Sequence, residues 1–157
     1  MKKFRFSLQS LFEVKQTLKD KLQADFAEAE AAWRTALERQ LDLERLYEEE
    51  IAAFEARARE GVTAPELSGA AAYHEDLRER IQRAKAEVAR TLKIMTEKRE
   101  ELVAVHKEIR VLEKLQEKQY AEYLKEVEKD EAKVMDSILA FQETEKKAEE
   151  DTDAEVL

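Results

Sequence analysis

Two histidines and many clustered carboxylates are the residues of this chain that could do chemistry. His74 and His106 are its only histidines, and an imidazole can serve as a general base or a metal ligand. Runs such as Glu48–Glu50 supply neighbouring carboxylates of the kind that acid–base catalysis uses. The sequence has no cysteine, so it offers no thiolate nucleophile, no cysteine zinc site and no disulfide.

These groups do not assemble into a site on the elements that the sequence predicts. His74 and His106 fall on one predicted helix, where a rise of about 1.5 Å per residue separates them by about 48 Å. We expect His74 to be exposed beside a helix break and His106 to flank an apolar seam. A Gly-rich phosphate loop is excluded because glycine occurs only at positions 61 and 69. We predict no catalytic residue, cofactor or metal, and a protein that is not an enzyme.

The elements that position every side chain are two long helices separated by one break. Gly61, Pro65 and Gly69 are the only glycines and the only proline, and these residue types are the least tolerated inside a helix. Thr63 and Glu66 have the spacing of a capping box, so Pro65 is an alternative start for the second helix. The predicted ranges are helix 7–60, turn 61–69, helix 70–147 and a disordered acidic tail 148–157.

Apolar residues recur at steps of three and four along both predicted helices, which is the pattern of a coiled-coil seam. We therefore predict an all-α fold, a long antiparallel two-helix coiled-coil hairpin that forms a single elongated domain over residues 1–157. The seam of the first helix is predicted at Leu22, Phe26, Ala29, Trp33, Ala36, Gln40, Leu43 and Tyr47, and that of the second at Leu77, Ile81, Ala84, Val88, Leu92, Met95, Leu102, Val105, Ile109 and Leu112.

The second helix overhangs the first in this arrangement. Pairing across the break leaves residues beyond about 127 without a partner in the chain, yet Val134, Ile138 and Phe141 continue an apolar stripe at helical spacing. Such a stripe favours a binding surface for another protein. The alternative is that the stripe packs against residues 1–7, which include Phe4 and Phe6.

Composition and charge exclude several classes of partner. The chain is 41% charged and 7% aromatic, with a net charge of −9 and no sustained basic stretch, so we expect no nucleic-acid binding. No apolar run approaches the roughly 20 residues that span a bilayer, so we expect no membrane insertion. Basic residues dominate positions 1–21 and acidic residues dominate 143–157, which is typical of either a solvated end or a docking end.

Large side chains on the seam are further candidates for partner contact. Trp33, Gln40 and Tyr47 fit core packing, with Gln40 setting the register, but in a two-stranded coiled coil their edges can also remain exposed. The region after the break, with Tyr73, Leu77 and a run of alanines, forms a second candidate surface.

Both ends of the chain carry recognisable patterns, namely Phe4–Phe12 followed by Val14 and Lys15, and the segments Glu113–Tyr120 and Glu131–Asp136. In these patterns the chain resembles the flagellar export protein FliJ family. The resemblance extends to the length, the two-helix layout and the position of the break. Ser137 departs from the family pattern, which usually has a glutamate after the aspartate.

The resemblance implies a non-enzymatic, cytoplasmic component of the flagellar type III export apparatus, serving bacterial motility and chemotaxis and lying peripheral to the inner membrane at the basal body. It implies a stalk in the hexameric export ATPase, contact with the cytoplasmic domain of the membrane export gate, and escort of export chaperones. Gln40 and Tyr47 match surface positions of the family. The implied gate contacts are Tyr73, Leu77, Arg80 and Ala84, and the implied ATPase-ring contacts are Phe4, Phe6, Leu8, Leu11, Val134, Ile138 and Phe141.

Two other functions remain open at this point. One is a generic coiled-coil scaffold or spacer that dimerises through the overhang. The other is the equivalent stalk protein of a virulence type III secretion system.

Overall fold

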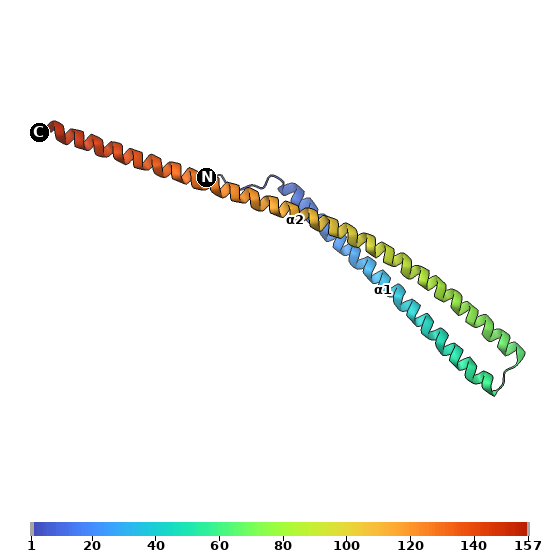
Figure 1. The fold of residues 1–157 in the computed structure, drawn as a ribbon. Coiled ribbons are helices and arrows are strands. Elements are labelled where there is room, and N and C mark those ends of the chain that lie inside the picture. Colours follow the sequence, from blue (N-terminus) through green and yellow to red (C-terminus); the bar gives the residue numbers. More distant parts are fainter. Residues whose placement is uncertain (1, 157) are drawn as a thin grey trace. The chain divides into compact units, whose positions relative to one another are not determined.

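The computed structural model describes residues 2–156 and contains two helices, α1 over Gln9–Glu60 and α2 over Ala64–Val156 (Figure 1). The two helices pack against each other and the described residues form no strand, which confirms the predicted all-α helical hairpin. The chain divides into two compact units. Unit 1 is Met1–Glu13 with Glu108–Leu157, and unit 2 is Val14–Lys107.

The break between the helices is shorter than predicted and spans residues 61–63. Gly61 has a φ of 109°, which L side chains rarely adopt, and its N–H donates to the Ala58 carbonyl at 3.2 Å. Gly69 lies inside α2, because one glycine costs a long helix only about 1 kcal/mol relative to alanine. The expected turn at 61–69 therefore closes at Thr63.

Helix α2 begins with the predicted capping box. The Glu66 N–H donates to Thr63 Oγ1 at 3.3 Å, and the Thr63 N–H donates to Glu66 Oε2 at 3.2 Å. The helix then continues through residues 148–156, where the sequence analysis expected no fixed structure. That segment contains no glycine or proline, and alanine, glutamate and lysine favour the helical backbone.

The seam of unit 2 follows the predicted positions on α1, all of which are buried or half-buried. On α2 the prediction of Leu92 is wrong: Leu92 is 43% exposed, and Thr91 is buried in its place. The Thr91 hydroxyl donates to the carbonyls of Glu87 and Val88, so its polar group is satisfied within the helix. The spacing of three and four residues is therefore kept through a polar side chain, and Lys98 continues it as a half-buried residue.

Unit 1 has a smaller core, made where the first residues of the chain lie against α2. Phe6, Ile109 and Leu112 are its buried apolar side chains. Phe6 and Phe12 pack edge to face with ring centroids 6.5 Å apart. Beyond Val127 every described residue of α2 is exposed.

Candidate interaction surfaces

The two histidines lie in different environments in the structure. His74 is buried, contrary to the expectation that it is exposed, and its ring lies 5.7 Å from the Phe54 ring and 6.3 Å from the Tyr47 ring. His106 is exposed. Among residues 2–156, no group of three or more histidines and carboxylates is placed to hold a metal ion. His74 thus contributes to the packing of unit 2 beside the break.

The amino-terminal strap, residues 2–7, is held on α2 by aromatic and polar contacts within unit 1. The Phe4 ring lies 5.1 Å from the ring of Tyr120 and 5.5 Å from that of Tyr123. The Tyr123 hydroxyl donates to the Lys2 carbonyl at 2.8 Å, and Gln119 Nε2 donates to Ser7 Oγ at 2.9 Å. Phe4 is therefore engaged within the chain and only half-buried there.

The overhang, residues 128–156 of α2, carries an apolar stripe that nothing in unit 1 covers. Val134 is 60% exposed and Phe141 is 64% exposed, with Ile138 between them on the same face. The alternative that this stripe packs against Phe4 is wrong, because Phe4 packs on the Tyr120 and Tyr123 rings instead. Leu8 and Leu11 are also exposed.

The four residues that the resemblance assigned to the export gate divide into two kinds. Tyr73 is 40% exposed and Arg80 is exposed, with its guanidinium 2.9 Å from the Asp76 carboxylate. Leu77 is 0% exposed and Ala84 is also buried, so both belong to the seam between the helices. Leu77 and Ala84 are thus unavailable at the surface of unit 2.

The three seam residues considered as contact candidates are all half-buried. Arg78 Nε donates to the Tyr47 hydroxyl at 2.9 Å across the two helices, and Gln40 Nε2 donates to Glu44 Oε1 at 3.2 Å along α1. The buried Trp33 indole nitrogen has no hydrogen-bond partner in the described structure. Tyr47 and Gln40 therefore already use their polar groups inside the hairpin.

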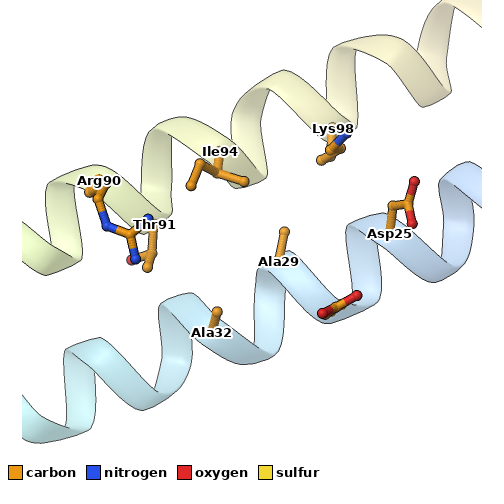
Figure 2. Close-up of a pocket in the computed structure, with 8 residues that line it drawn as sticks. Asp25, Ala29, Ala32, Arg90, Thr91, Ile94 and Lys98 are labelled. Carbon is orange, nitrogen blue, oxygen red and sulfur yellow. The ribbon is translucent and has the colours of Figure 1, made fainter.

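One flank of unit 2 is hollowed by two openings that sequence reasoning missed. The first, of about 380 Å³, lies where Ala29 and Ala32 of α1 face Thr91 and Ile94 of α2, with Asp25 and Lys98 at one end (Figure 2). The second, of about 410 Å³, is lined by Ala36, Arg39, Leu43, Arg80, Arg83, Ala84 and Glu87. The signal that could have found them is the run of alanines at seam positions, which leaves space between two helices.

The fold and these surfaces define a class, an all-α helical hairpin with an exposed apolar stripe in unit 1 and an open flank in unit 2. Neither helix has a stretch within residues 2–156 that is apolar enough to cross a membrane.

The family follows from a sequence model described as "Flagellar FliJ protein", which matches residues 4–148. Because the match covers nearly the whole chain, the protein belongs to the FliJ family and is related to flagellar type III export. No curated protein and no solved structure gave a significant match.

Proposed function

We propose that this protein is the central stalk of the flagellar export ATPase ring, that it links the ring to the membrane export gate, and that it escorts export chaperones. The observation that carries the proposal is the family match together with an α2 that, with no glycine or proline after Gly69, extends into a fully exposed overhang. In this proposal the protein is not an enzyme. It works in the cytoplasm, peripheral to the inner membrane at the basal body.

The ring contact is proposed for the overhang and the start of α1. Val134, Ile138 and Phe141 expose apolar surface that costs free energy in water, at about 25 cal/mol per Å², until a partner covers it. Leu8 and Leu11 add exposed apolar area in the same unit. Phe4 and Phe6 act indirectly, because they hold the strap and the first turn of α1 in place.

The gate contact is proposed for Tyr73 and Arg80, the two exposed members of the expected patch. The two residues are seven positions apart and so share one face of α2, and tyrosine and arginine are residue types that protein interfaces favour. We expect Tyr73→Ala to weaken binding to the cytoplasmic domain of the gate while the far-ultraviolet circular dichroism stays unchanged. Val111→Ala serves as the control, because Val111 is also exposed and lies in the other unit. Equal losses in the two variants would remove the gate assignment.

The test of the stalk proposal is the turnover rate and oligomeric state of the cognate export ATPase, measured with and without this protein. We expect stimulation at substoichiometric amounts, accompanied by hexamer formation. No effect on either quantity, from a protein of correct helicity, would reject the stalk. A tight dimer of the protein alone that buries residues 127–141 would instead favour the coiled-coil scaffold.

A further inference from the structure

The two openings on unit 2 follow one another along the same faces of α1 and α2, and together they are called the flank groove. Asp25, Glu28, Ala32 and Arg39 line it from α1 and lie three, four and seven residues apart, so they share one helix face. On α2 the lining residues from Arg80 to Lys98 recur at the same spacing. At about 1.5 Å per residue, the stretch from position 25 to position 43 is about 27 Å long, the length of five helical turns.

The floor of this flank groove is made of small side chains. Ala29, Ala36 and Ala84 are buried in the seam, and Ala32 is exposed above it. Ile94 stands at the edge with 36% of its surface exposed and points into the opening (Figure 2). Because alanine fills so little space, another helix can approach closely here and place an apolar side chain beside Ile94.

The charges around the groove differ between its two ends. At the end shown in Figure 2, the carboxylates of Asp25 and Glu28 on α1 face two basic residues of α2, Arg90 and Lys98, so the charges there balance. At the other end are three arginines and one carboxylate, Glu87. Both oxygens of Glu87 already accept hydrogen bonds from Arg90, which lies outside that opening.

The arginine end is lined by three basic side chains and one carboxylate. Arg80 pairs with Asp76 at 2.9 Å, and Arg83 pairs more loosely with Glu79 at 3.8 Å. Arg39 forms no ion pair within residues 2–156. The pKa of Glu87 is lowered mainly by the hydrogen bond from Arg90, and the charge of Arg39 adds a small further lowering. On a chain with a net charge of −9, such an end selects an acidic partner.

The opposite flank differs in being bridged. Lys85 Nζ lies 3.9 Å from Glu44 Oε1, which joins α2 to α1 across the seam on that side. An ion pair across the helices leaves a third helix less access to the seam, so the open flank is the docking side.

We propose that the flank groove binds an amphipathic helix of a partner protein, about five turns long, which inserts an apolar side chain over Ala29 and Ala32 and places glutamates or aspartates against Arg39 and Arg83. Guanidinium forks bind carboxylates in a fixed bidentate geometry, which sets the direction of the bound helix. This contact is separate from the proposed ring contact and shares only Arg80 with the proposed gate contact. Its test does not involve the ATPase or the gate.

The test uses the full chain and a labelled synthetic helix of about 18 residues, with leucines along one face and three glutamates in its last two turns, followed by fluorescence anisotropy. We expect saturable binding by the wild-type protein. Ala32→Trp fills the groove and should weaken binding about tenfold or more, because the wider side chain occupies the space of the inserted leucine. Ala31→Trp is the matched control, since Ala31 is exposed and does not line the groove.

A charge exchange keeps the test independent of folding. The double variant Arg39→Glu, Arg83→Glu should bind the acidic peptide about tenfold less tightly and should bind a peptide with lysines in place of the glutamates more tightly than wild type does. A misfolded protein would not gain that second affinity.

Three results would overturn the proposal. They are no saturable binding of the acidic peptide, equal loss in Ala31→Trp and Ala32→Trp, or a lysine peptide that binds wild-type protein as tightly as the acidic one. Displacement of the peptide by a single-stranded DNA oligonucleotide would assign the arginines to nucleic acid and would also overturn it.

Discussion

Replacing Leu77 and Leu92 separately by alanine tests the seam of unit 2 residue by residue. The sequence pattern predicts both leucines to be buried, whereas the structure buries Leu77 completely and leaves Leu92 43% exposed. A buried leucine contributes about 1.5–3 kcal/mol through transfer from water, and the cavity left by truncation adds to the loss. Leu77→Ala should therefore lower the free energy of unfolding by about 3 kcal/mol.

The expected effect of Leu92→Ala is smaller for two reasons. Almost half of the Leu92 side chain stays in water, and its truncation leaves no enclosed cavity. We expect a loss below about 1 kcal/mol, because alanine is also the better helix former. In a chain of this length, 1 kcal/mol corresponds to about 2–4 °C in Tm, so the Leu77 variant should melt about 6–12 °C lower than wild type.

The assay is urea and thermal unfolding followed by circular dichroism at the helix band. An unchanged dependence on urea concentration would show that the variants unfold from the same structure. Equal losses of stability in the two variants, or a larger loss for Leu92→Ala, would refute the seam described here. The pair also separates packing from binding, since a partner contact at Leu77 would require the side chain to leave the core.

Substitutions at four further positions test the break and the charged flank. Gly69→Ala should stabilise the protein by about 0.5–1 kcal/mol, since no atom lies within 4 Å of the added methyl group. Gly61→Ala should destabilise it by about 1 kcal/mol or more, because Gly61 has a positive φ. Urea unfolding that ranks the two variants in the reverse order would contradict this. Thr63→Ala should cost about 1 kcal/mol and Thr63→Ser should retain most of the stability, and equal Tm values for the two would argue against the capping box. The hydrogen bond from Arg90 lowers the pKa of Glu87 from its ordinary 4.5, so the pair stabilises the fold above that pH and loses its contribution as the pH falls. Arg90→Gln should therefore make the free energy of unfolding fall less steeply as the pH is lowered. An unchanged fall would show that the pair contributes nothing to stability.

The two-helix hairpin was predictable from the sequence because few residues can break a helix and all of them lie in one window. The capping residues Thr63 and Glu66 were predictable for the same reason, since their spacing matches the first turn of a helix. The length of the break was not, because Gly69 is compatible with either a turn or a helix and nothing in its surroundings decides between them.

The seam was predictable where the side chains were apolar and failed where the helix geometry required a polar residue. The prediction placed Leu92 on the seam because leucine is apolar, although the alternation of three- and four-residue steps after Val88 favours Thr91. The burial of His74 also depended on packing that sequence cannot show, since its neighbours Tyr47 and Phe54 come from the other helix. The flank groove arises from small residues and arginines on two helices, so it appears only once they are paired.

The measurement that tests the proposed stalk most directly is stimulation of the cognate export ATPase by two double variants of the overhang. Val134→Glu with Ile138→Glu places charge on the apolar stripe, whereas Ala132→Glu with Ala140→Glu adds the same charge to exposed residues on another face of α2. The proposal predicts that the first pair abolishes stimulation and hexamer formation and that the second pair preserves both. Equal stimulation by the two variants would contradict the seating of the overhang in the ring.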